Sequence, residues 1–498
     1  MSAPAYEAPA QMAAPRDILP SGGNRPERTG RRSQRWALPV ALVTVVALLG
    51  AGAAVAYGAL SGGGAQPESV VPASAFGFAK VDFDPAAEQK IAVLRLSRHF
   101  PSVHGNSIDD LRDSILRPMV ERSGGSRYDA TVRPWVGQRA GVAGWVDAGG
   151  RPQALVVLQY TDADKARRGL AALAGEHRGY ALSGGYAVIA ESQRVADEAL
   201  AAARTRSLGA GGTYRSDVAS LHGNQLVTAW VDLPSAVRAA AAVGGTATSG
   251  LTGGLVDASS GRLVLGVRAE ATFLQMAGHT VGAASAVATA RPGPAAGRLL
   301  TNLPDGTAAA LAMGSSSALT EAAQKIAGVR SGATEAGPHA NSTWTEVLGN
   351  LPALLGDGAV LAVGSVDAQT PSGGLRTHAK DPAATTRAYE AFSKLLASVG
   401  LEARTQPAPG GDVVLGVGPG YAAALATGGR LGQGKRFQQA MGTLPAAPAA
   451  ALYVDVTKVS GGLGLSGTSD LKAVQTIGGW VGIEAGQPSF QLRVVVGG

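Results

Sequence analysis

Cysteine is absent from this chain of 498 residues. Its absence excludes disulfide bonds, thiolate nucleophiles, iron–sulfur clusters and zinc sites built on thiolates. Charged residues make up only 16% of the chain and aromatic residues 5%. Hydrophobic residues reach 45%, which excludes a wholly disordered chain, because disorder requires low hydrophobicity and high charge. The 70 glycines follow no Gly-X-Y period, so a collagen triple helix is excluded as well.

The positive charge of the chain is concentrated near its N-terminus. The net charge is +7, and Arg28, Arg31, Arg32 and Arg35 lie close together, whereas the excess over the rest of the chain is dilute. Nucleic-acid surfaces require clustered Lys and Arg side chains. We therefore expect no nucleic-acid partner.

An uncharged apolar run, residues 37–60, follows these arginines. As a helix it would be about 36 Å long, enough to cross a hydrocarbon core of about 30 Å. The positive-inside rule places the N-terminus in the cytoplasm and everything after Leu60 outside the membrane. We predict a single-pass signal-anchor: a disordered cytoplasmic tail over 1–36, a transmembrane helix over 37–60 and a linker over 61–72. A cleaved signal peptide, with a small-residue site at 54–56, is the alternative.

An internal repeat is the most informative pattern in the sequence. Leu208-Gly209-Ala210-Gly211 recurs as Leu431-Gly432-Gln433-Gly434, and Trp230-Val231-Asp232 matches Tyr453-Val454-Asp455 at the same offset of 223 residues. Tyr214 matches Phe437 at that offset too. The period is far too long for a solenoid. We predict two related units, over 73–290 and 296–497.

Strand patterns alternate with helix patterns inside each unit. Apolar or alternating runs predict strands at 75–83, 140–146, 154–160, 186–190, 226–232 and 262–267, and in the second unit at 308–313, 359–366, 413–417, 450–456, 479–483 and 490–496. Asp381-Pro382 predicts a helix start, and Thr161 with Asp164 predicts another. A Gly149-Gly150 turn between two strands predicts a hairpin. The fold class is therefore α+β, with mixed or mainly antiparallel sheets and helices.

The segment 71–85, VPASAFGFAKVDFDP, and the Gln89-Lys90-Ile91 helix after it carry a family resemblance. Together with the apolar run, they resemble the actinobacterial membrane proteins of domain-of-unknown-function family 3352. The resemblance would cover most of residues 60–498. It implies a single-pass extracytoplasmic protein, and it supplies no activity, ligand or catalytic residue.

Three short motifs imitate known sites. Residues 462–467 fit G-x-G-x-x-G, with Glu484 about 20 residues on, but they do not follow a strand at once as a dinucleotide site requires. Residues 429–436 resemble a phosphate loop, but Arg436 replaces the hydroxyl that holds magnesium. Ser469 and Lys472 fit S-x-x-K without the other elements of penicillin-interacting enzymes. We interpret all three as loops or chance matches.

Aspartate follows valine at the end of several predicted strands, and histidines are scattered. The aspartates could form a carboxylate cluster at one sheet edge, or they could cap turns and helices, which we favour. These residues are Asp82, Asp147, Asp232, Asp367 and Asp455. No histidine pair has metal-ligand spacing, so a metal site is not indicated. Because the other motifs are interpreted as loops or caps, we assign no catalytic or cofactor-binding residue and no cofactor.

The sequence favours a binding or structural module at the cell envelope over an enzyme. Its partners would be the bilayer, through residues 37–60, and an envelope ligand or protein that the sequence does not identify. One alternative is an exported hydrolase that uses carboxylates or Ser469 and Lys472. The other is a carrier of an apolar ligand or lipid, which predicts a large apolar pocket.

Overall fold

The computed structural model describes residues 65–84, 87–100, 107–122, 128–174, 178–242, 260–282, 293–315, 350–366, 370–398, 400–462 and 470–497. The predicted tail and transmembrane helix, residues 1–60, lie outside this part of the chain. No helix within the described ranges combines the length and apolarity needed to cross a bilayer.

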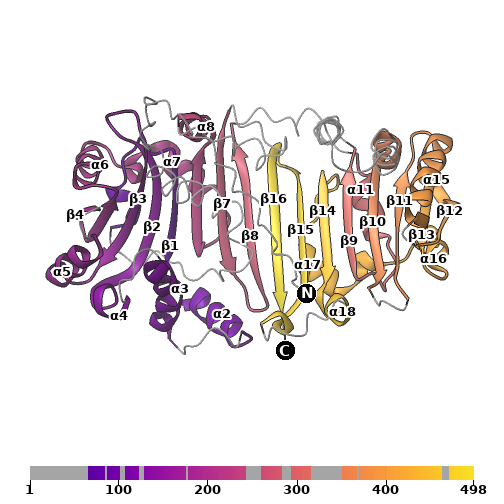
Figure 1. Cartoon of the computed structure of the whole chain (residues 1–498), viewed down its shortest axis with the longest axis horizontal. Helices are drawn as coiled ribbons and strands as arrows, with labels where there is room; N and C mark the ends of the chain where they lie inside the picture. Colours follow the sequence, from indigo (N-terminus) through magenta and orange to yellow (C-terminus); the bar gives the residue numbers. More distant parts are fainter. Residues whose placement is uncertain are drawn as a thin grey trace, which may run out of the picture.

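One large sheet organises the described residues (Figure 1). Its strands are β1 (Gly77–Asp82), β2 (Val136–Val146), β3 (Pro152–Tyr160), β4 (Gly179–Ser183), β5 (Tyr186–Ala190), β6 (Val227–Asp232), β7 (Arg262–Ala269), β8 (Phe273–Val281), β9 (Ala309–Gly314), β10 (Gly358–Ser365), β11 (Ser372–His378), β12 (Ala403–Ala408), β13 (Asp412–Val417), β14 (Ala450–Asp455), β15 (Val474–Glu484) and β16 (Gln487–Val496). Neighbouring strands pair antiparallel throughout. The predicted α+β class with a mainly antiparallel sheet is confirmed.

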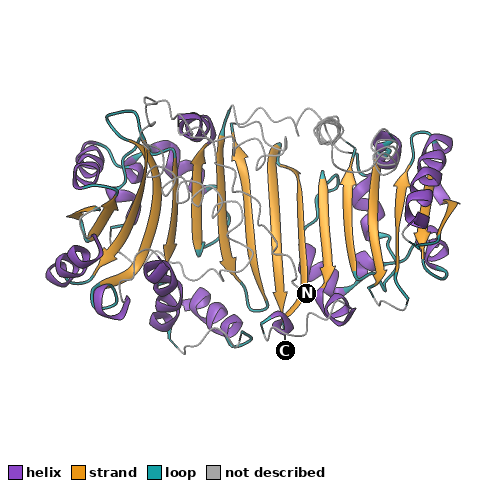
Figure 2. Ribbon diagram, viewed as in Figure 1, coloured by secondary structure: helices purple, strands orange, loops and turns teal. Residues whose placement is uncertain are grey.

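Helices pack on both faces of this sheet (Figure 2). They are α2 (Ala87–Ser97), α3 (Ile108–Arg122), α4 (Tyr128–Thr131), α5 (Ala163–Ala174), α6 (Gln193–Thr205), α7 (Gly212–Ala219), α8 (Leu233–Ala242), α11 (Ala295–Thr301), α14 (Leu351–Leu355), α15 (Pro382–Ser398), α16 (Tyr421–Thr427), α17 (Lys435–Met441) and α18 (Val456–Gly462). Short 3-10 helices are η1 (Pro67–Val70), η2 (Leu208–Ala210), η3 (Pro409–Gly411), η4 (Leu431–Gln433) and η6 (Leu471–Ala473). One face is covered by α6, α7, α11, α16 and α17. Towards the outer strands, α2–α5 and α14–α15 cover the other face.

The strand order repeats on either side of the sheet centre. From the centre outward, the strands of the first half run β8-β7-β6-β1-β2-β3-β5-β4. Those of the second half run β16-β15-β14-β9-β10-β11-β13-β12, which is the same order with eight added. Strands β8 and β16 pair with each other, so the ranges 73–290 and 296–497 do not form separate sheets.

Aromatic side chains that the repeat aligns are buried at matching places. Trp230 is the fourth residue of β6 and Tyr453 the fourth of β14, with exposed fractions of 5% and 2%. Each ring contacts an aromatic side chain of the preceding helix. The Tyr214 and Trp230 ring centroids are 5.9 Å apart, and those of Phe437 and Tyr453 are 5.2 Å apart. Both rings are therefore core side chains at equivalent positions of the two strands.

The two L-G-x-G segments also adopt the same conformation. Leu208 and Leu431 are buried and each begins a 3-10 turn. The Gly211 N–H donates to the Leu208 carbonyl and the Gly434 N–H to the Leu431 carbonyl, both at 2.9 Å. Backbone φ and ψ are −69° and 122° at Gly211, and −68° and 131° at Gly434. Each segment leads directly into a helix, α7 or α17.

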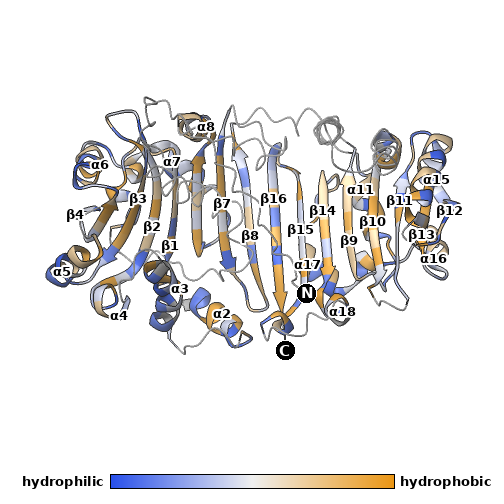
Figure 3. Ribbon diagram, in the orientation of Figure 1, coloured by the Kyte–Doolittle hydropathy of each residue, from blue (hydrophilic) through white to orange (hydrophobic). Residues whose placement is uncertain are grey.

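Strands β9, β10 and β14 consist mainly of apolar residues, as Figure 3 shows. Leu361, Leu311 and Leu452 lie in register across β10, β9 and β14. Leu361 and Leu452 keep exposed fractions of 42% and 38%. They lie on the face opposite to α11 and α17, because the side chains that pack on those helices are the alternate residues of the same strands.

The structure corrects two local predictions, namely where the linker ends and which residue caps α5. The linker predicted over 61–72 is wrong from Ala65 onward, since Pro67–Val70 form η1 and Val71 is fully buried. Val70 and Val71 pack into the core. The linker was predicted because these two residues lie in a stretch that is rich in glycine and proline. Thr161 is not the cap of α5, because its hydroxyl donates to the Trp135 carbonyl. Asp162 accepts from the Asp164 and Lys165 N–H groups instead, both at 3.0 Å.

The other predicted turns are confirmed. The Asp381 carboxylate accepts from the N–H groups of Ala383 and Ala384, and α15 begins at Pro382. Strands β2 and β3 form the predicted hairpin, in which Gly150 has a φ of 76°. That left-handed conformation favours glycine at this position.

Candidate functional site

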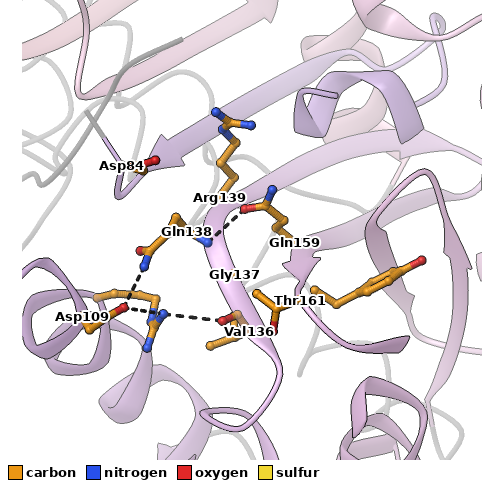
Figure 4. A pocket seen from close by; sticks show the side chains of 10 residues that line it. Asp84, Asp109, Val136, Gly137, Gln138, Arg139, Gln159 and Thr161 are labelled. Carbon is orange, nitrogen blue, oxygen red and sulfur yellow. Dashed lines mark hydrogen bonds and ion pairs between the residues drawn. The ribbon is translucent and has the colours of Figure 1, made fainter. Parts of the chain in front are cut away.

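A polar cleft of about 420 Å³ opens at one end of strands β1–β3 (Figure 4). It lies between α3, the residue pair that follows β1, the start of β2 and the end of β3. The residues that line it are Asp84, Asp109, Arg112, Val136, Gly137, Gln138, Arg139, Gln159, Tyr160 and Thr161. The sequence motifs identified none of these residues as a candidate binding residue, because they come from four separate segments.

An irregularity at the start of β2 shapes the cleft. The pairing of β2 with β3 shifts between Val136 and Ala140, so the intervening residues leave the regular ladder. Gly137 lies inside this bulge, where a Cβ atom would come within 2.8 Å of the Gln159 side chain. Without that atom, the Gln159 Oε1 can accept a hydrogen bond from the Gln138 N–H at 3.0 Å. Glycine at this position therefore leaves room for the Gln159 side chain beside the bulge.

Both arginines of the cleft are buried and ion-paired. Arg112 is 6% exposed and contacts Asp113 at 2.7 Å and Asp109 at 2.9 Å. Arg139 is also 6% exposed, and its Nε donates to the Asp82 carboxylate at 2.8 Å. An isolated buried charge would be very costly, so each guanidinium requires its carboxylate. Neither cation is free to neutralise an anionic ligand.

Burial shifts the pKa of two groups behind the cleft. It raises the pKa of Asp82 above its usual range, although the hydrogen bond from Arg139 acts in the opposite direction. Burial also raises the pKa of Tyr186 to about 12. The Tyr186 hydroxyl donates to the Ala65 carbonyl at 2.7 Å, and Arg139 donates to the same carbonyl at 3.5 Å. Ala65 is thereby held beside the cleft.

The cleft offers unused hydrogen-bond acceptors. Gln138 lies between Asp109 and Gln159, and its Nε2 donates to the Asp109 carboxylate at 2.7 Å (Figure 4). The Gln138 Oε1 is buried and accepts no hydrogen bond from any described residue. Asp84 and Asp109 keep side-chain exposures of 49% and 59%. A buried acceptor without a donor costs about 1–3 kcal/mol.

The aspartates at strand ends cap turns and helices. Asp232 accepts from the Ser235 N–H at 2.9 Å, and Asp455 accepts from the Thr457 hydroxyl at 2.6 Å. Asp147 accepts from the Arg151 N–H in the β2–β3 turn. Asp82 lies at the opposite end of the sheet from Asp147 and Asp232, because β1 runs antiparallel to both β2 and β6. Asp367 lies outside the described residues.

The motif residues do not form a nucleotide or hydrolase site within the described ranges. Helix α18 begins directly after β14, before the glycines, and residues 463–469, including Ser469, are not described. Arg436, in the loop that resembles a phosphate loop, pairs with Asp455 at 3.2 Å. Lys472 lies exposed in η6, and Glu484 ends β15. No group of ligands able to hold a metal ion occurs among the described residues.

The described histidines lie in separate environments. His279 Nε2 is 2.7 Å from the Ser220 hydroxyl, and burial lowers the pKa of this histidine. His378 Nδ1 is 2.8 Å from Asp412, a buried carboxylate that Arg298 and Arg376 also contact. His99 and His222 belong to no group of possible metal ligands among the described residues, and the histidines at 104, 177 and 339 lie outside the described ranges.

No protein-family model and no curated protein matches this chain. Two solved structures, crystal form III and crystal form I of TP0453, resemble it. The first has 10% sequence identity, covers 43% of this chain and 79% of its own, and gives a TM-score of 0.23. The second has 9% identity, covers 44% and 80%, and gives a TM-score of 0.22. A likeness this weak does not bear on function.

Proposed function

We propose that this protein is an extracytoplasmic binding module, held at the cell membrane by one N-terminal helix over residues 37–60. The length and apolarity of that segment support the anchor, and the arginines before it support a cytoplasmic N-terminus. The folded chain is already in place at Ala65, a few residues after the apolar run. The binding role rests on the cleft at the end of β1–β3.

The proposal includes a duplication, with residues 73–290 and 296–497 as two related α+β units. The repeated strand order supports it. Equivalent backbone hydrogen bonds support it further. The Asp232 N–H donates to the Phe76 carbonyl at 2.9 Å, and the Asp455 N–H donates to the Ala308 carbonyl at 2.7 Å. Phe76 and Ala308 precede β1 and β9, which hold the same place in their halves.

The ligand that fits the cleft best is a small neutral molecule rich in hydroxyl groups. The buried Gln138 Oε1 is the observation that carries this proposal, because it needs a donor. Asp109 offers a second acceptor, while the Gln159 amide nitrogen offers a donor. A hydroxyl group both donates and accepts, so a polyol or sugar can satisfy all three. The paired arginines disfavour an anion, and the polar lining disfavours the apolar ligand of a lipid carrier.

Titration calorimetry of the full chain in detergent tests this proposal, with myo-inositol and a panel of neutral monosaccharides as probes. Gln138→Met removes the amide and keeps the length of the side chain, and we expect at least tenfold weaker binding. Gln487→Met, at an exposed position at the start of β16, is the matched control and should bind as the parent does. Absence of binding to every probe, or equal binding by Gln138→Met, would reject the proposed ligand class.

An exported hydrolase remains the second candidate, because Asp84 and Asp109 both line the cleft. Paired carboxylates, one of them protonated, are the usual groups for glycoside hydrolysis. Chromogenic glycosides distinguish the two functions. A hydrolase would release the chromophore and lose this activity in Asp84→Asn and Asp109→Asn, whereas a binding module would bind the sugar and leave the glycoside intact.

A further inference from the structure

The distance between the proposed anchor and the fold is short. The apolar run ends at Leu60, and Ala65 is fixed by hydrogen bonds from Tyr186 and Arg139. Four residues, Ser61–Gly64, separate them. Whatever conformation they take, five steps of at most 3.6 Å give a reach of about 18 Å. Ala65 therefore lies within about 18 Å of the edge of the hydrocarbon core. The lipid headgroup layer occupies several ångströms of this distance.

Ala65 marks one end of the strands. Arg139, which donates to its carbonyl, also pairs with Asp82, the last residue of β1. Helix α2 begins five residues after Asp82 and lies at the same end, below the strands in Figure 1. Helix α8 follows β6, which is antiparallel to β1, and therefore lies at the opposite end.

Helix α2 presents an apolar and basic side to solvent. Ile91 is 51% exposed, the largest exposure among the large hydrophobic residues described. Arg95 and Arg98 are exposed as well, and neither forms an ion pair with a described residue. Ile91 and Arg95 are four residues apart and share one side of the helix, and Arg98 follows directly after the helix ends at Ser97. The exposed Glu88, three residues before Ile91, lies on the same side. The other side of α2 is buried through Ala92, Val93 and Leu96.

We infer that this side of α2, with Ile91 and Arg95, and Arg98 directly after the helix, rests on the outer surface of the membrane and contacts anionic lipid headgroups. The inference rests on the proposed anchor. An exposed aliphatic side chain next to unpaired arginines is the composition that binds an anionic lipid surface. A short tether favours the contact further, because it keeps the local concentration of lipid high. In this orientation, the end of β1 and the start of β2 face the bilayer, and α8 lies at the end of the sheet that is far from it.

The absence of cysteine makes a direct test possible, since each introduced cysteine is unique. Ile91→Cys and Ala241→Cys place a thiol on exposed residues of α2 and α8, at opposite ends of the sheet. The full chain is reconstituted in phosphatidylcholine vesicles with a minor fraction of phosphatidylglycerol, and each thiol carries an environment-sensitive fluorophore. Brominated lipids then report contact with the bilayer by quenching.

We expect severalfold stronger quenching at position 91 than at position 241, and a blue-shifted emission at position 91 alone. Adding Arg95→Glu and Arg98→Glu should reduce the quenching at position 91. Equal quenching at both positions, or none at position 91 in chains that float with the vesicles, would overturn the inference. Chains that do not float with the vesicles would instead contradict the proposed anchor, so the two failures are distinguishable.

Discussion

Replacing Trp230 and Tyr453 tests how the two halves of the sheet are stabilised. Both side chains are almost fully buried, and each packs on a ring of the preceding helix. Removing a buried large aromatic side chain usually costs about 3–5 kcal/mol. We expect Trp230→Ala and Tyr453→Ala each to lower the free energy of unfolding by about that amount, at similar slopes of the denaturant dependence.

Conservative variants separate the two sites more finely. The Trp230 Nε1 donates to the Asp217 carboxylate at 2.9 Å, and the same oxygen accepts from Arg262 at 2.6 Å. Trp230→Phe loses this hydrogen bond and part of the ring, for a cost of about 2 kcal/mol. Tyr453→Phe should cost less than about 1 kcal/mol, because no described residue hydrogen-bonds to its hydroxyl.

Chemical denaturation followed by far-ultraviolet circular dichroism measures these differences. Exposed Arg238→Ala in α8 is the control and should stay within about 0.5 kcal/mol of the parent. If both alanine variants lost less than about 1 kcal/mol, the two rings would not be core residues. The argument from matched burial would then be refuted.

Three further predictions address topology, pH and the cleft. A reporter active only in the cytoplasm should be silent when fused after Gly498 and active when fused before Arg16; the reverse would contradict the membrane topology. Burial raises the pKa of Asp412, but hydrogen bonds from Arg298, His378 and Arg376 outweigh it, so the pKa is lowered overall. Its stabilisation is therefore present above the unfolded value near 3.8 and lost as the pH falls. Asp412→Asn should cost about 3 kcal/mol at pH 7, and denaturation melts should show this difference shrinking below about pH 4. Gly137→Ala should displace Gln159 and weaken any polyol binding found by calorimetry, with near-normal stability.

Sequence patterns predicted most of the strands, and the strands that they missed have physical causes. Strands β4, β8, β11 and β12 were not predicted. The β11 sequence contains two adjacent glycines and β12 contains Pro407, which is tolerated because β12 is an edge strand. Strand β4 is a short edge strand, and the side chain of Gln193 bonds both backbone polar groups of Tyr180. Local propensity is weak in such segments, and pairing partners decide their conformation.

The cleft could not be predicted from the sequence. Its residues come from 84, 109–112, 136–139 and 159–161, and none of these short stretches matches a binding motif. Only the pairing of β1 with β2 and of β2 with β3 brings them together. In contrast, the sequence did predict that aspartates at strand ends cap turns and helices, because capping depends on neighbours within about three residues.

The sequence by itself determined the local features of this protein. Apolar periodicity predicted twelve of the strands, the matched residues at an offset of 223 indicated the repeat, and the uncharged run over 37–60 indicated an anchor. The tertiary structure decided that β8 pairs with β16, so that both ranges share one sheet. It also decided that Arg112 and Arg139 are neutralised beside an unused Gln138 acceptor. Periodicity and capping act between near neighbours in the chain, whereas strand pairing and the satisfaction of buried charge depend on residues that only folding brings into contact.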